Sequence, residues 1–141
     1  MEGRALRFVA PRRVEIQPVG VGPPGPGELL VRTRWSGISG GTELLAYRGE
    51  LDPDLDLDET IASLGGSFRY PFAYGYSCVG EVERSGAEGL GEGTTVFAFH
   101  PHQDRFTVEA ADVVTVDGVD GRVATLFPLV ATTPQVTLAA G

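Results

Sequence analysis

The chain has only two histidines, His100 and His102, and they flank Pro101 in the stretch FAFHPHQDRF. Imidazole has an ordinary pKa close to neutral pH, so either ring could take up or release a proton in a reaction. At this spacing both rings can face one cleft, which would predict an acid–base site. The alternative is an ordinary turn after a strand, because the stretch lacks the third group that defines a site.

Three tyrosines, Tyr70, Tyr74 and Tyr76, lead into a strand-like run in YPFAYGYSCVGEV. Gly75 and Gly80 in the same run indicate that another backbone segment or a ligand comes close to it. The alternative is a core strand that is entered through packed aromatic rings. The residues alone leave both interpretations open.

The stretch GVGPPG, residues 20–25, formally matches the GxGxxG pattern of dinucleotide-binding loops. That pattern works because backbone N–H groups and the start of a following helix hold a pyrophosphate. Pro23 and Pro24 have no N–H to donate, and a strand-like run follows them. We therefore expect an ordinary loop here.

Alternating carboxylates in DPDLDLDE, residues 52–59, resemble part of a calcium loop. A calcium loop of the EF-hand type needs Gly at its sixth position and Glu at its twelfth. Counted from Asp52, these positions hold Leu57 and Ser63. A solvated acidic segment is the better interpretation.

The chain has 141 residues, which suits one domain, and a net charge of -8. The negative charge argues against a nucleic-acid partner, since phosphates need a basic face. Cys78 is the only cysteine, so neither an intramolecular disulfide nor a thiolate cluster can form. No apolar run reaches the length of a membrane span or signal sequence, and we expect a soluble, cytoplasmic protein.

Short runs rich in β-branched and aromatic residues recur between turn residues, which is typical of an antiparallel sandwich or barrel. In GTELLAYRG we expect a short helix with Thr42 as N-cap, Glu43 in its first turn and Gly49 as its stop. A second short helix is expected to end at Gly65, and 121–141 is apolar and helix-like in its later half. The expected strands are 5–10, 13–19, 28–37, 77–86, 94–99, 105–109 and 112–116.

Four stretches, in this order, resemble the GroES-like catalytic domain of the medium-chain dehydrogenase/reductase superfamily, of the alcohol dehydrogenase type. They are GPGELLVRTRWSGISGGTELLAYRGE, YPFAYGYSCVGEVERSGAEG, GTTVFAFHPHQDRFTV and LFPLVATTPQVTLAAG. The resemblance implies a mainly β fold with short helices, a partly open GroES-like barrel. Residues 1–125 would form this domain, and 126–141 would begin the helix that leads to a Rossmann-type domain absent from the chain. The abrupt apolar end favours a piece of a longer enzyme.

The zinc-binding members of the superfamily carry metal ligands at positions that this sequence has changed. The ligand cysteine falls on Ser39, the His and Glu of a Gly-His-Glu motif fall on Tyr76 and Ser77, and an acid of polyol-type members falls on Phe127. Hydroxyl, phenol and phenyl groups are not ordinary zinc ligands. A structural zinc would need four cysteines. We therefore predict no catalytic and no structural zinc.

The resemblance implies an oxidoreductase that uses NAD(P)H, bound mainly by the absent domain, and transfers hydride to or from a carbonyl, alcohol or enone. The chain most resembles a subgroup with YGYxxVG and HPHQ that acts on bulky biosynthetic substrates, such as bacteriochlorophyllide dehydrogenase relatives. A small-molecule substrate and, at full length, a homodimer are the expected partners. The alternative function is a non-catalytic binding or assembly domain.

Without zinc, hydrogen-bond donors must stabilise the developing oxyanion of the substrate. The candidate catalytic residues are Ser39, Thr42, Tyr76, His100 and His102, and the candidate cofactor-binding residues are Gly40, Gly41, Thr42 and Thr132.

Overall fold

A computed structural model describes residues 1–58, 60–61 and 63–128. The chain begins with an antiparallel hairpin of β1 (Glu2–Ala10) and β2 (Arg13–Gly20), in which Leu6 lies opposite Ile16. Arg12, in the turn, has a positive φ of 62°. Ala5 and Phe8 of β1 are both buried, and they point to opposite faces of the strand because successive side chains alternate, whereas all of β2 stays partly or fully exposed. The hairpin therefore contacts the rest of the domain mainly through β1.

Five further strands form a second antiparallel sheet in the order β6-β3-β4-β5-β7. In its centre, Val31 pairs with Phe106 on one side and Val82 on the other, and all three side chains are almost fully buried. A side chain at Gly80 would collide with the carbonyl oxygen of Arg32, so glycine permits β3 and β4 to approach closely. The bounds are β3 (Glu28–Ser36), β4 (Cys78–Ser85), β5 (Thr95–Ala98), β6 (Arg105–Glu109) and β7 (Val113–Thr115).

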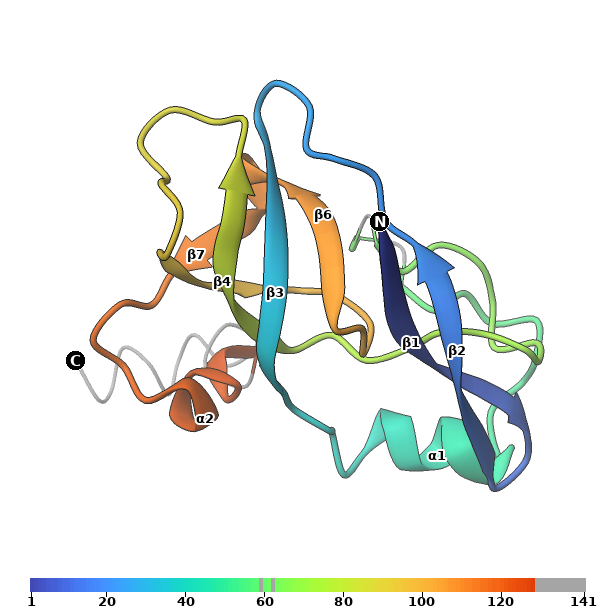
Figure 1. Cartoon of the computed structure of the whole chain (residues 1–141). Helices are drawn as coiled ribbons and strands as arrows, with labels where there is room; N and C mark the ends of the chain where they lie inside the picture. Colours follow the sequence, from blue (N-terminus) through green and yellow to red (C-terminus); the bar gives the residue numbers. More distant parts are fainter. Residues whose placement is uncertain (59, 62, 129–141) are drawn as a thin grey trace.

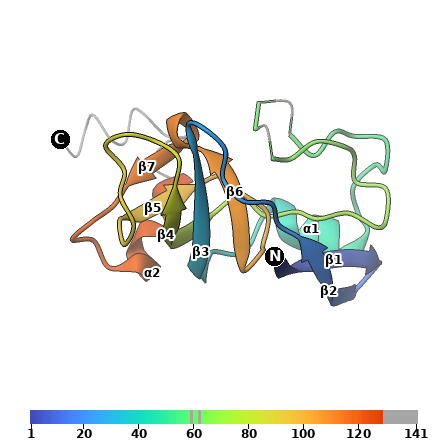
Figure 2. The same ribbon diagram turned by 45° about the horizontal axis from the view of Figure 1, so that its top comes forward.

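The larger sheet curls, and the hairpin stands beside its β6 edge as a separate ribbon (Figure 1). Helix α1 (Thr42–Arg48) lies at the lower end of the hairpin, whereas α2 (Gly121–Ala124) lies at the far side of the sheet (Figures 1 and 2). The long connection from α1 to β4 folds back on the hairpin. Phe72 of this connection stacks on Phe8 with ring centroids 5.1 Å apart.

All seven strands expected from the sequence are present, with ends that differ by a few residues, and the mainly β, GroES-like fold class is confirmed. The prediction for Thr42 was wrong in detail, because Gly41 is the N-cap and Thr42 is the first helical residue. Gly49 ends α1 as expected, in the left-handed conformation with φ of 75°.

The helix expected to end at Gly65 is not formed by the described residues of that segment. Asp52 and Asp58 instead accept hydrogen bonds from nearby backbone N–H groups, which include those of Asp54 at 2.9 Å and Thr60 at 2.7 Å. Such local bonds compete with helical ones. The proposed boundary at residue 125 stays a prediction, since 129–141 lie outside the described residues. Among those that are described, no helix could cross a membrane.

Candidate active site

His102 lies in the connection between β5 and β6 and is fixed by backbone bonds to two distant segments. Its N–H donates to the carbonyl of Tyr74 at 3.2 Å, and its carbonyl accepts from the N–H of Leu6 at 3.0 Å. The ring passes directly over Gly75, where an added Cβ would lie only 2.5 Å from Nε2. The position of this imidazole is therefore set jointly by the hairpin, by the aromatic segment and by the absence of a side chain at Gly75.

Glu43 faces His102 from the first turn of α1. Its side chain is buried, with 3% of the residue exposed, and its Oε1 contacts Nε2 of His102. Its Oε2 accepts a hydrogen bond from the N–H of Ser39 at 2.5 Å. Both carboxylate oxygens thus have a partner, which a buried acid requires.

Ser36, at the end of β3, completes a chain of three side chains. The residue is exposed, and its hydroxyl contacts Nδ1, the other ring nitrogen of His102. An ionised carboxylate can only accept, so Nε2 carries the hydrogen toward Glu43. In the neutral ring Nδ1 then accepts the Ser36 O–H. The order hydroxyl, imidazole, carboxylate allows a proton to move between the surface and His102.

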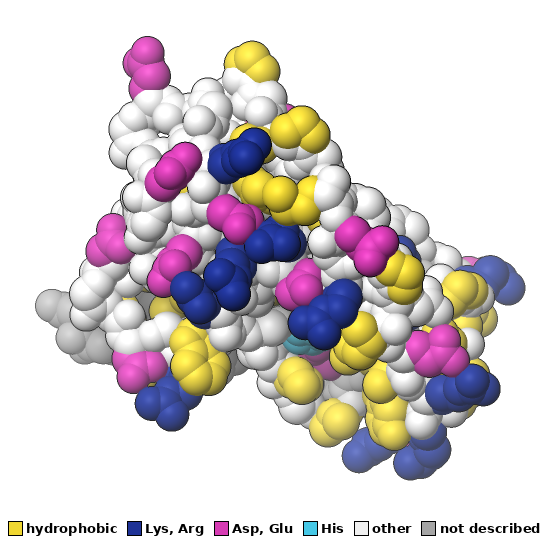
Figure 3. All heavy atoms as spheres, viewed as in Figure 1, with side chains coloured by type: hydrophobic (Ala, Val, Ile, Leu, Met, Phe, Trp, Pro, Cys, Tyr) yellow, Lys and Arg dark blue, Asp and Glu magenta, His cyan; other side chains and the backbone are white. Residues whose placement is uncertain are grey.

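This chain of groups lines one wall of an apolar cavity of about 410 Å³. In the space-filling view, one histidine side chain is partly visible at the surface, next to a basic side chain and close to hydrophobic ones (Figure 3). A mostly apolar site with a few converging polar groups is the usual form of a small-molecule site. The lining residues are Leu6, Phe8, Val14, Ser36, Ile38, Glu43, Leu44, Tyr47 and His102.

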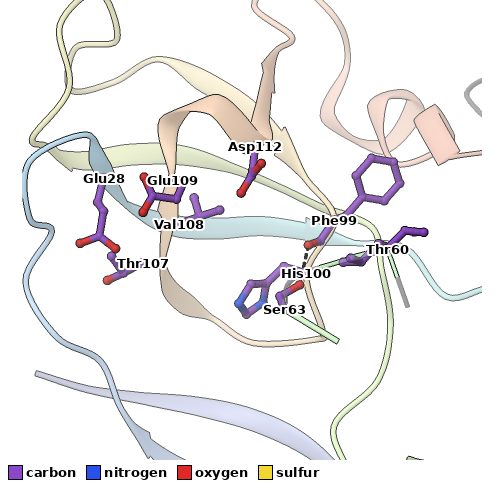
Figure 4. A pocket seen from close by; sticks show the side chains of 10 residues that line it. Glu28, Thr60, Ser63, Phe99, His100, Thr107, Val108, Glu109 and Asp112 are labelled. Carbon is purple, nitrogen blue, oxygen red and sulfur yellow. Dashed lines mark hydrogen bonds between the residues drawn. The ribbon is translucent and has the colours of Figure 1, made fainter. Parts of the chain in front are cut away.

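His100 lies elsewhere, so the two histidines do not face one cleft as the sequence suggested. Its ring stacks on Phe106 with centroids 3.9 Å apart, and its Nδ1 donates to the carbonyl of Pro101 at 2.9 Å. It lines a different cavity, of about 370 Å³, together with Ser63 and Glu109 (Figure 4). Burial lowers the pKa of His100 to about 4, so its ring is neutral near pH 7.

Comparisons of sequence and of fold with known proteins lead to one and the same family. The chain is 33% identical over 98 residues to 2-desacetyl-2-hydroxyethyl bacteriochlorophyllide A dehydrogenase from Cereibacter sphaeroides, a match that covers 69% of this chain and 27% of that protein. The enzyme of the same name from Rhodobacter capsulatus matches with 33% identity, over 69% of this chain and 28% of its own length. The chain thus spans well under a third of these relatives. No model of a known protein family matches it.

Solved structures agree on the fold. Human synaptic vesicle membrane protein VAT-1 homolog-like protein superposes with a TM-score of 0.71 at 21% identity, over 97% of this chain and 43% of that one. The chain is a GroES-like domain of the medium-chain dehydrogenase/reductase superfamily. A thermostable alcohol dehydrogenase from Pyrobaculum aerophilum gives a TM-score of 0.65 at 18% identity, over 91% and 44% of the two chains.

The superfamily's zinc positions hold groups with other partners in this GroES-like domain. Ser39 Oγ accepts from the N–H of Gly41 at 3.2 Å, and Ser77 Oγ donates to the carbonyl of Thr125 at 2.7 Å. Tyr76 packs against Tyr74, and Phe127 packs on Phe97 with centroids 4.8 Å apart. This donor set does not fit zinc. In residues 1–58, 60–61 and 63–128, no three His, Cys, Asp or Glu side chains could jointly hold a metal ion.

The candidate cofactor-binding residues are only partly placed. Gly40, Gly41 and Thr42 lie exposed where the loop enters α1, and an added Cβ at Gly40 would meet nothing within 4 Å. A nicotinamide cofactor could therefore approach this backbone closely. Thr132 lies outside the described residues.

Sequence reasoning missed Ser36 and misread Glu43 as a residue that only complements the helix dipole. Glu43 is 59 residues from His102 and Ser36 is 66 residues from it. One signal was available: an acid in the first turn of an otherwise apolar helix face. It gave no indication of its partner.

Proposed function

We propose that the chain is the substrate-side domain of a zinc-independent, NAD(P)-dependent oxidoreductase. Such an enzyme would transfer hydride to or from a carbonyl, alcohol or enone of a biosynthetic substrate. The dehydrogenase names of the sequence relatives support the reaction class. The observation that carries the proposal is the buried Glu43–His102 pair, which reaches an apolar cavity through Ser36.

The residues of this domain would handle the proton of the reaction. In the oxidation of an alcohol, the substrate O–H gives its proton to Ser36 Oγ while the Ser36 proton moves to Nδ1 of His102. Glu43 keeps its hydrogen bond to Nε2–H throughout, which fixes the ring and its tautomer. Bound nicotinamide supplies the hydride acceptor in this direction. For reduction of a carbonyl the proton moves the opposite way.

Among the five candidate catalytic residues, the geometry favours His102 as the acid–base group. His100 faces the other cavity and is neutral, so we assign it no role in proton transfer. Ser39, Thr42 and Tyr76 remain candidate hydrogen-bond donors to the substrate oxygen or the cofactor. Their hydroxyls would provide part of the oxyanion stabilisation that zinc gives elsewhere in the superfamily.

The proposal is tested by measuring single-turnover hydride transfer in the whole protein, through the change in nicotinamide absorbance. We expect His102→Gln to slow this step by about 10²- to 10⁴-fold, the usual contribution of a positioned acid or base. His100→Phe, which keeps a ring over Phe106 at a residue without a role in proton transfer, should change it far less. An unchanged rate in His102→Gln would remove His102 from the mechanism.

Metal analysis of the same preparation tests zinc independence separately. We expect much less than one equivalent of zinc and a hydride-transfer rate that chelators leave unchanged. One bound equivalent, with activity lost on chelation, would contradict the zinc-free mechanism.

A further inference from the structure

The cavity beside His102 is formed by apolar side chains from three separate segments of the chain. Leu6, Phe8 and Val14 come from the hairpin, Ile38 comes from the loop after β3, and Leu44 and Tyr47 come from α1. Its volume, about 410 Å³, lies in the range of ligand sites for small organic molecules. The remaining lining residues are Ser36, Glu43 and His102.

The polar groups of this cavity are nearly all occupied by one another. Glu43 uses one oxygen for His102 and the other for the N–H of Ser39, and both ring nitrogens of His102 have partners. The hydroxyl of Ser36 contacts His102 Nδ1 and lies 3.7 Å from Cys78 Sγ, but the residue is exposed and its oxygen keeps capacity for a further hydrogen bond. At the His102 end of the cavity, Ser36 is therefore the polar contact open to a ligand.

The charges of the lining residues exclude an anionic ligand. Among the described residues no Arg lines the cavity, and the only carboxylate there, Glu43, would repel an anion. A charged group of the ligand would also lose its hydration in an apolar space, which is costly without a partner.

We propose that this cavity binds a bulky, uncharged, largely apolar molecule through one hydroxyl or carbonyl oxygen, which hydrogen-bonds to Ser36. The apolar body of the molecule fills the space between the hairpin and α1. The inference deepens the proposed function, because this molecule would be the substrate of the oxidoreductase. Binding itself needs neither cofactor nor turnover.

The test is isothermal titration calorimetry of the whole protein without nicotinamide, using acetylnaphthalene and ethylnaphthalene as probes. The two probes have the same ring and the same number of carbon atoms, and only the first has an oxygen. We expect acetylnaphthalene to bind roughly fivefold more tightly, the value of one net hydrogen bond. Ser36→Ala should remove this difference and leave the affinity for ethylnaphthalene unchanged.

Two neighbouring leucines of α1 allow a matched test of where the ligand binds. Leu44 and Leu45 are exposed to a similar extent, 37% and 39%, but only Leu44 lines the cavity. We expect Leu44→Arg to weaken both probes by about tenfold or more, as burying a charge in the site is unfavourable. Leu45→Arg should weaken neither.

The inference is overturned if Ser36→Ala keeps the preference for the oxygen-bearing probe, or if the two arginine variants behave alike. Ser36→Ala replaces an exposed side chain, so it keeps the test decisive even where Leu44→Arg fails to fold. Probe binding without hydride transfer would refute the oxidoreductase but retain the site. Hydride transfer without probe binding would refute the proposed site but retain the oxidoreductase.

Discussion

His100 and His102 are separated by one proline, yet they lie in opposite environments. His102 has a carboxylate on one ring nitrogen and a hydroxyl on the other, at the edge of an apolar cavity. His100 stacks flat on Phe106 and hydrogen-bonds only to the carbonyl of Pro101 among the contacts described for its ring. The two rings nevertheless line different cavities.

The difference shows that the partner of an imidazole, more than its position in the sequence, decides its chemistry. At His102 a buried anion and a hydroxyl form a path along which a proton can move. At His100 burial acts without a compensating anion, lowers the pKa to about 4, and leaves a neutral ring that packs as an aromatic side chain. One site can serve acid–base chemistry and the other serves packing.

The largest expected effect comes from removing the anion that faces His102. Glu43→Ala leaves two donors, the Nε2–H of His102 and the N–H of Ser39, without their acceptor, and each buried donor left in this way costs about 1–3 kcal/mol of unfolding free energy. Chemical denaturation measures this change. Glu50→Ala is the matched control, since Glu50 is exposed and lies 3.9 Å from Arg48, and it should cost at most about 1 kcal/mol. Equal losses in both variants would mean that the Glu43–His102 pair has no special role in stability.

A second change acts on the position of His102 and leaves its partners in place. Gly75 has φ of 112° and lies against the imidazole, so Gly75→Ala combines an unfavourable backbone conformation with a collision at the ring. The backbone strain alone costs about 1–3 kcal/mol, and the displaced ring should also slow hydride transfer in the whole protein. Denaturation and single-turnover kinetics measure the two effects.

Gly20→Ala is the control for this change, because an added Cβ there meets nothing within 4 Å. We expect it to alter neither quantity appreciably. If Gly75→Ala also changed neither the unfolding free energy nor the rate of hydride transfer, the close packing of His102 on this glycine would be required for neither stability nor activity.

The strands were predictable because their signals are local. Alternating apolar residues and turn residues at β-strand spacing are visible in any short window, and all seven expected strands are present. Gly75 and Gly80 were also identified correctly as points of close approach. The same local reasoning failed at 52–65, where both a helix and local Asp hydrogen bonds suit the residues and the structure contains the latter.

The candidate site was not predictable in the same way, because it is made by non-local contacts. His102 was named from its type alone, but its partners come from the end of β3 and the start of α1. Their meeting depends on the hairpin, whose Leu6 holds the backbone of His102. No spacing in the sequence encodes that geometry, so Ser36 and Glu43 could be recognised only in the folded chain.

The smallest expected effect comes from the other histidine and depends on pH. The pKa of His100 falls from 6.5 to about 4 on folding, so between these values the unfolded chain binds more protons than the folded one. Stability therefore decreases as the pH is lowered through this window, by at most about 2 kcal/mol between pH 7 and pH 5. His100→Phe keeps a flat ring over Phe106 but cannot take up a proton, so its stability should decrease less than that of the unsubstituted protein. Denaturation curves at both pH values measure the difference, and identical pH dependence in the two proteins would show that His100 does not titrate differently on folding.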